Sequence, residues 1–179
     1  MSRGDAPQDS TGTCTAAPRR TTLFAGSRRR DEIGDRLFIG VDLGATKILT
    51  LVARETGEVL ASCRQPTDAH EGPEAVVRRI VECARSALDE AGAPLEAIAG
   101  VGAMAAGPLD LARGVITTPP NLPGWRDVPL RDMLRRAFGL PVLLENDANA
   151  QGYGEYRFGA GKGARHLLFV TVSTGIGGG

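Results

Sequence analysis

Hydrophobic residues gather in three strand-like runs where the ordered part of the chain begins. The runs cover residues 37–43, 47–54 and 58–64 and follow each other closely. The letters ETGE between the second and third runs have the composition of a hairpin turn, with glycine in the turn itself. The pattern therefore predicts three successive strands, of which the last two form a hairpin.

The hydrophobic period changes after residue 70. In EGPEAVVRRIVECARSALDEAG, apolar residues recur at helical spacing, with Pro73 near the first turn and Gly92 after the last. Farther along, IAGVGAMA and LPVLLEN are typical of buried strands, and VPLRDMLRRAFG is typical of an amphipathic helix. DANAQGYGEYRFGAG predicts a helix that ends in glycines, and HLLFVTVSTG predicts the last strand. The predicted order is βββαβαβα, an α/β fold followed by the opening of a further unit.

Residues 1–36 have no hydrophobic period and are rich in Ser, Thr, Gly, Pro and Arg. This composition predicts a disordered extension, which is too short for a DNA-binding helix-turn-helix domain. We expect an amino-terminal domain over residues 37–146. Residues 147–179 then form the start of a second, truncated domain.

Composition adds limits on partners and location. Hydrophobic residues make up 42% of the chain and charged residues 23%, and the formal net charge is zero. These values are ordinary for a soluble globular protein and give no field that attracts nucleic acid or a membrane. Apolar runs are too short to span a bilayer, and the start lacks a signal-peptide core. The three cysteines lack metal-ligand spacing and are interpreted as reduced thiols. A cytoplasmic protein without nucleic-acid or membrane partners is predicted.

Residues 42–47, DLGATK, form the first of three segments that could bind a ligand or take part in catalysis. Asp42 lies at a predicted strand end, where a carboxylate can hold Mg²⁺ through water. The Gly-x-Thr turn that follows can direct backbone N–H groups at phosphate oxygens. The alternative interpretation is an ordinary tight turn with a solvated aspartate.

The second segment is LLENDANA, which places Asn146 and Asp147 between a buried strand and a helix. The tip of a strand in an α/β sheet is a usual ligand site, and a carboxylate there can take a proton from a substrate hydroxyl. Both residue types are also favoured helix caps, which is the alternative. The third segment, TVSTGIGGG, repeats the strand and Thr/Gly turn of the first, and its alternative is a glycine-rich hairpin.

The order DLGATK, GPLD, PPNLPGW, ENDANA and TVSTGIGGG resembles the ROK family of sugar kinases and related repressors. Those proteins belong to the superfamily with the actin-like ATPase, or ribonuclease H-like, fold. The resemblance runs from about residue 37 to the last residue. It implies the amino-terminal half of a two-domain kinase, without the family's adenosine pocket and its His/Cys zinc motif.

The resemblance also implies roles for individual residues. Asp147 is the expected catalytic base, Asn146 the expected hydrogen-bond partner of sugar hydroxyls, and Gly107 and Gly175 line the sugar through their backbone. The expected phosphate and magnesium contacts are Asp42, which faces the metal ion, with Gly44, Ala45, Thr46, Lys47, Thr174 and Gly175.

Ala45 stands where the family more often has glycine. If the backbone at this position needs a positive φ, alanine costs about 1 kcal/mol there.

The leading expectation is phosphorylation of a hexose at its primary hydroxyl by ATP and Mg²⁺, with glucose as the favoured sugar. The residues that would separate glucose from N-acetylmannosamine or fructose are expected beyond Gly179. The alternatives are a sugar-responsive repressor and an inactive truncated remnant. A homo-oligomer is expected for the full-length protein, and zinc only in its carboxy-terminal half. We interpret the remaining candidates as structural or solvated residues: Glu155, Trp125, His70, His166 and Lys162.

Overall fold

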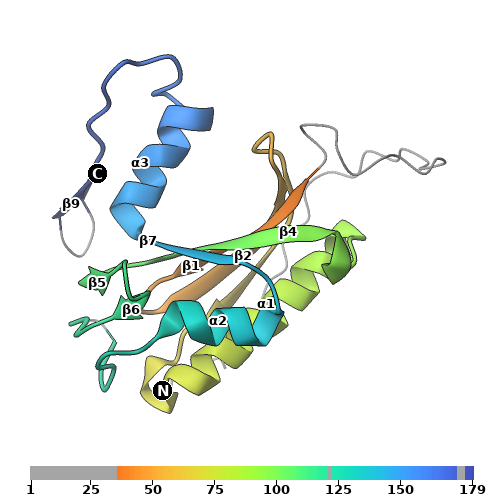
Figure 1. The fold of residues 1–179 in the computed structure, drawn as a ribbon, viewed down its shortest axis with the longest axis vertical. Coiled ribbons are helices and arrows are strands. Elements are labelled where there is room, and N and C mark those ends of the chain that lie inside the picture. The colour runs from red at the N-terminus through yellow and green to blue at the C-terminus, as the bar shows by residue number, and fades with distance from the viewer. Residues whose placement is uncertain (1–35, 121, 173–175) are drawn as a thin grey trace, which may run out of the picture.

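Figure 1 shows the fold, a computed structural model that describes residues 36–120, 122–172 and 176–179. The predicted disordered extension lies outside the described residues except for Arg36. Cys14 is also outside them, whereas Cys63 and Cys83 are buried in the core. In the part of the chain that the structure describes, no helix combines the length and apolar character needed to cross a membrane.

A five-stranded sheet forms the centre of the fold. Its strand order is β3-β2-β1-β4-β7; β1, β2 and β3 pair antiparallel, and β4 and β7 run parallel to β1. The hairpin predicted at ETGE joins β2 to β3, with Gly57 at a φ of 90°. The strands are β1 (Leu37–Leu43), β2 (Lys47–Arg54), β3 (Val59–Pro66), β4 (Ile98–Ala105) and β7 (Val142–Asn146).

Two helices, α1 (Pro73–Ala91) and α2 (Leu130–Phe138), pack on the same face of this sheet (Figure 1). Helix α1 begins at the predicted proline and ends before Gly92, which adopts a φ of 63°. The Gly92 N–H donates to the last carbonyls of the helix, as glycine caps commonly do. The helix α3 (Asp147–Phe158) follows directly from β7.

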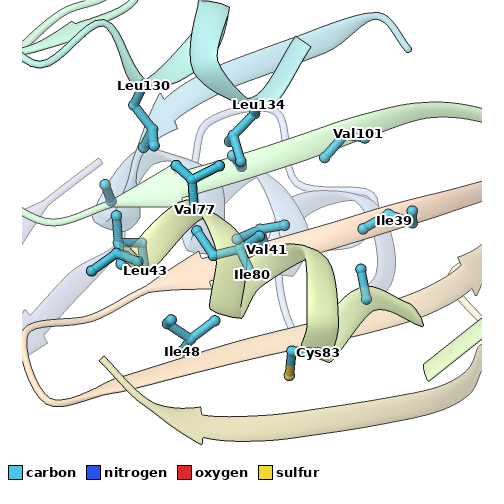
Figure 2. Close-up of a cluster of buried hydrophobic side chains, with 14 of the residues drawn as sticks. Ile39, Val41, Leu43, Ile48, Val77, Ile80, Cys83, Val101, Leu130 and Leu134 are labelled. Carbon is cyan, nitrogen blue, oxygen red and sulfur yellow. The ribbon is translucent and has the colours of Figure 1, made fainter. Parts of the chain in front are cut away.

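The hydrophobic core lies between the sheet and these two helices. Alternate residues of β1 point into it, and they pack with Ile80 of α1 and Leu134 of α2 (Figure 2). The opposite face of the sheet carries a pocket of about 720 Å³, lined mainly by apolar side chains such as Leu51 and Met104. Leu143 on this face is 72% exposed.

The structure adds short elements that have too few residues for a periodic signal. They are β5 (Leu109–Asp110), which pairs with β6 (Val115–Ile116), and the single turns η1 (Ala69–Glu71) and η2 (Leu95–Ala97). The last predicted strand, residues 166–175, starts later than expected, and its last three residues lie outside the described residues. It contains β8 (Val170–Val172), which pairs antiparallel with β9 (Ile176–Gly178).

Candidate functional site

The segments DLGATK, AAGPLD and ENDANA leave the sheet at one edge. In the parallel register, Leu43 is aligned with Ala105, and Ala105 is aligned with Asn146. The carboxyl ends of β1, β4 and β7 therefore lie side by side. Ligands of open α/β sheets bind at this kind of edge.

The first segment forms a tight turn between β1 and β2. The Gly44 N–H donates to the Lys47 carbonyl at 3.0 Å, with Ala45 and Thr46 between them. Among the described residues other than glycine, positive φ angles occur only at Asp68 and Asp127. Ala45 therefore does not adopt a left-handed backbone, and alanine at this position carries no free-energy cost from a positive φ.

The N–H groups of Ala45 and Thr46 have no hydrogen-bond acceptor in the described part of the chain. Thr46 is exposed and Ala45 is partly exposed. Successive N–H groups that are free of internal partners are suited to bind phosphate oxygens. The turn is thus compatible with the predicted phosphate loop.

Asp42 and Asp147 are brought close together although the chain between them is long. Burial raises the pKa of the partly buried Asp42 carboxyl, and the nearby Asp147 carboxylate raises it further. The positive charges of Lys47 and Arg64 act in the opposite direction on this pKa. The site therefore holds two neighbouring carboxylates, with the positive charges of Lys47 and Arg64 close to Asp42.

This pKa shift predicts that Asp42 makes folding pH-dependent. Because the folded-state pKa lies above its ordinary value of 3.8, the native state binds more protons between the two values. Stability from this group is therefore lost as the pH rises through that window. We expect Asp42→Asn to melt at a higher temperature than the wild type at pH 7 without divalent cations, with the difference shrinking toward pH 4. Thermal unfolding monitored by circular dichroism measures the two melting temperatures. An equal difference in melting temperature at pH 7 and pH 4 would contradict the prediction.

Asn146 is the N-cap of α3. Its Oδ1 accepts hydrogen bonds from the N–H groups of Ala148 at 3.0 Å and Asn149 at 3.4 Å. Its Nδ2 group has no acceptor among the described residues and remains able to donate to a ligand. The capping interpretation is confirmed, and it is compatible with a second role in sugar binding.

Asp147 is the first residue of α3, where the positive end of the helix dipole favours a carboxylate. Its Oδ1 accepts from the Ala148 N–H at 2.9 Å. No donor among the described residues contacts Oδ2, and the side chain is partly exposed. The Oδ2 atom is therefore available to a substrate hydroxyl.

Glu145 belongs to the same site, although sequence reasoning did not select it. Its Oε1 accepts from the Asn146 N–H at 2.8 Å and from Asn149 Nδ2 at 3.0 Å. It thereby ties the end of β7 to the first turn of α3, on either side of Asp147. A carboxylate within an otherwise apolar strand was the available signal in the sequence.

Gly107 lies in the turn after β4 and has a φ of 102°. A Cβ atom there would lie 3.3 Å from the Cβ of Pro119, so both backbone and space favour glycine. The next carbonyl, of Pro108, accepts two hydrogen bonds from Thr117, which fixes the turn. The exposed backbone of Gly107 therefore lies at the same edge as the other segments.

The second glycine segment contains Thr174 and Gly175, which lie outside the described residues. The strands beside them, β8 and β9, form the hairpin that was the alternative interpretation of this segment. A Cβ atom on Gly177 would lie 3.3 Å from the Cβ of Ala148, next to Asp147. The described part of this segment thus approaches the first turn of α3.

The remaining candidates have the structural or solvated positions expected for them. Trp125 is buried, and its Nε1 donates to the Ala69 carbonyl at 3.4 Å, so its loop packs onto the domain. Glu155 accepts from the Ala160 N–H at 2.8 Å near the end of α3. The side chains of His70, His166 and Lys162 are exposed.

Within the described ranges, no three His, Cys, Asp or Glu side chains gather closely enough to hold a metal ion. Mg²⁺ needs no such cluster, because it usually binds through one or two carboxylates together with phosphates and water. The partly buried Asp42 carboxylate at the end of β1 fits that requirement.

Comparison with known proteins identifies close relatives. The model of the ROK family matches residues 38–179. A glucokinase of Streptomyces coelicolor is 43% identical over 143 residues, which are 80% of this chain and 43% of the relative. A putative xylose repressor of Caldicellulosiruptor is 34% identical over 80% of this chain and 36% of its own length. The chain thus spans less than half the length of these relatives.

Among solved structures, the ROK family glucokinase of Streptomyces griseus in complex with glucose and AMPPNP is similar. Its TM-score is 0.70 and its identity is 40%, over 79% of this chain and 43% of that one. The expected actin-like ATPase fold is confirmed by such neighbours. With a family match that covers most of its length, this chain belongs to the ROK family.

Proposed function

We propose that this chain contributes the sugar site and the first phosphate loop of an ATP-dependent hexose kinase. The observation that carries the proposal is the proximity of Asp42 and Asp147 at the edge of the sheet where the Ala45 and Thr46 N–H groups have no acceptor among the described residues. Phosphoryl transfer to an alcohol needs a proton acceptor, a phosphate cradle and charge neutralisation, and little other covalent chemistry.

In the proposed reaction, Asp147 accepts the proton of the sugar's primary hydroxyl. The hydroxyl oxygen forms a bond to the γ-phosphorus of ATP as the bond from that phosphorus to the β–γ bridging oxygen breaks. ADP leaves with the electron pair of the broken bond, and the products are the hexose 6-phosphate and ADP. Asn146 and the backbone of Gly107 hold the other hydroxyls, so that the reacting oxygen is in line.

The turn at Gly44–Lys47 would bind phosphate oxygens through its N–H groups, and Asp42 would hold magnesium. Magnesium, when bound, neutralises charge on the transferred phosphoryl group. We also propose that Thr174 and Gly175 approach the phosphates from a second domain that starts at residue 147. Closure of the two domains would exclude water from the reacting groups.

Glucose is the proposed sugar. Support comes from the identity to the Streptomyces coelicolor glucokinase and from the Streptomyces griseus structure, whose description names glucose and AMPPNP. We propose that the 179-residue chain alone does not catalyse the reaction, since it covers only 43% of the length of that glucokinase.

A chimaera tests this proposal: residues 1–179 joined to the carboxy-terminal part of the Streptomyces coelicolor glucokinase. Release of ADP is measured with glucose, mannose, fructose and N-acetylmannosamine, and the expected result is the highest kcat/KM with glucose. A higher value with another sugar would correct the substrate. A folded chimaera that binds glucose without phosphorylating any sugar would contradict the kinase and favour a sugar-sensing role, as in the family's repressors.

A further inference from the structure

We propose that Thr67 is a positioning residue that holds the turn at Gly44–Lys47 in its phosphate-binding shape, and that Arg79 holds Thr67 in place. Thr67 follows directly after β3 and is fully buried. Thr67 lies far from both glycine segments in the sequence, so the sequence alone does not indicate this role. The inference rests on the proposed function only in taking phosphate as the ligand of this turn.

Thr67 makes two hydrogen bonds to the turn. Its N–H donates to the Thr46 carbonyl at 3.0 Å, and its Oγ1 donates to the Gly44 carbonyl at 2.8 Å. The two carbonyls lie at the two ends of the turn. Thr67 thus fixes both ends of the segment that carries the Ala45 and Thr46 N–H groups.

These bonds determine where the N–H groups of the turn point. A peptide unit is planar and trans, so a fixed Gly44 carbonyl also fixes the direction of the Ala45 N–H on the opposite side. The Thr46 carbonyl likewise fixes the next peptide unit. The Thr46 N–H belongs to the peptide unit between these two and has little freedom left. Phosphate then meets donors that are already oriented, which lowers the cost of ordering them on binding.

Arg79 of α1 holds Thr67 in turn. Its Nη1 donates to the Thr67 carbonyl at 3.0 Å. The same guanidinium forms ion pairs with Glu71 and, at 3.9 Å, with Asp68, and its side chain is only 19% exposed. Thr67 therefore makes hydrogen bonds through its N–H, its carbonyl and its hydroxyl. Together these bonds connect α1 to the turn at Gly44–Lys47.

A second buried threonine provides a matched control. Thr50 in β2 is also fully buried, but its Oγ1 has no hydrogen-bond partner among the described residues. Valine replaces the hydroxyl by a methyl group at nearly the same size. Thr67→Val removes the bond to the Gly44 carbonyl, whereas Thr50→Val makes the same chemical change without removing a bond to the turn.

The test measures ¹⁵N order parameters of Ala45 and Thr46 by NMR in the 179-residue chain. We expect values of about 0.85 in the wild type and in Thr50→Val, and below about 0.6 in Thr67→Val. Thr67→Ser keeps the hydroxyl and should retain the wild-type values. Values in Thr67→Val equal to those of the wild type would overturn the inference. If Thr67→Val does not fold, Thr67→Ser and Thr67→Ala, which differ by one hydroxyl, replace it, and equal values in these two would overturn it.

A kinetic measurement in the chimaera adds a readout that loss of stability alone does not move. Thr67→Val should raise the KM for ATP roughly two- to tenfold, the effect of one hydrogen bond, with the KM for glucose unchanged. An equal rise in both KM values would overturn the positioning role. If the wild-type chimaera has no kinase activity, the proposed function fails, while the order parameters still decide whether Thr67 holds the turn.

The contribution of Arg79 is tested by a double-mutant cycle on the same order parameters. Arg79→Met should lower them in the wild-type background and have a smaller effect in Thr67→Val, where only the Thr67 N–H still joins this residue to the turn. Equal effects in both backgrounds would show that Arg79 does not support the turn through this residue.

Discussion

Asp147→Asn is expected to lower kcat of the chimaera by roughly 10²–10⁴ and to leave glucose affinity within a few-fold. Asparagine keeps the shape of the side chain and an oxygen that can accept from the Ala148 N–H. It cannot accept the proton of the attacking hydroxyl. Glucose binding by calorimetry and ADP release on the same variant separate the two effects.

The structure makes this test selective because the cap of α3 is Asn146 and not Asp147. A purely structural Asp147 would tolerate asparagine, and turnover would hardly change. Glu155→Gln is the matched control: it neutralises another carboxylate of α3, one that contacts only the Ala160 N–H in the described chain. We expect near-normal kcat for this control. Near-normal kcat for Asp147→Asn as well would contradict the assignment of the base.

Ile80→Ala is expected to lower the free energy of unfolding by about 2–5 kcal/mol. Ile80 is fully buried where α1 meets the sheet, among the side chains of Figure 2. Removing its outer carbons leaves a cavity that the surrounding strands cannot fill. Because domains of this size are stable by only about 5–15 kcal/mol, the loss is a large part of the total.

Thermal unfolding of the 179-residue chain measures this change, with an expected fall in Tm of about 6–15 °C. Arg85→Ala is the control in the same helix, because Arg85 is exposed and alanine favours helix. We expect its effect to stay within about 0.5 kcal/mol. Similar Tm values for Ile80→Ala and Arg85→Ala would show that α1 is not packed as described.

The sequence by itself determined the type and order of the long elements. Helical spacing between Pro73 and Gly92 predicted α1, and strand-like hydrophobic runs predicted the first three strands, because both signals are local and repeat over many residues. Short motifs also selected Asp42, Asn146 and Asp147 as candidate site residues. Residues of these types at strand ends have a limited set of roles. The two-residue strands β5 and β6 were missed because they are too short to show a period.

Only the tertiary structure decided which of these residues meet. Strand order and parallel register bring Asp42 to Asp147, and burial together with this neighbouring carboxylate raises the pKa of Asp42. The negative φ of Ala45 and the contacts of Glu145 and Thr67 depend on neighbours far away in the sequence. A periodic pattern records which face of an element is buried. It does not record which distant carbonyl or carboxylate that element will lie against, since pairing and packing decide this.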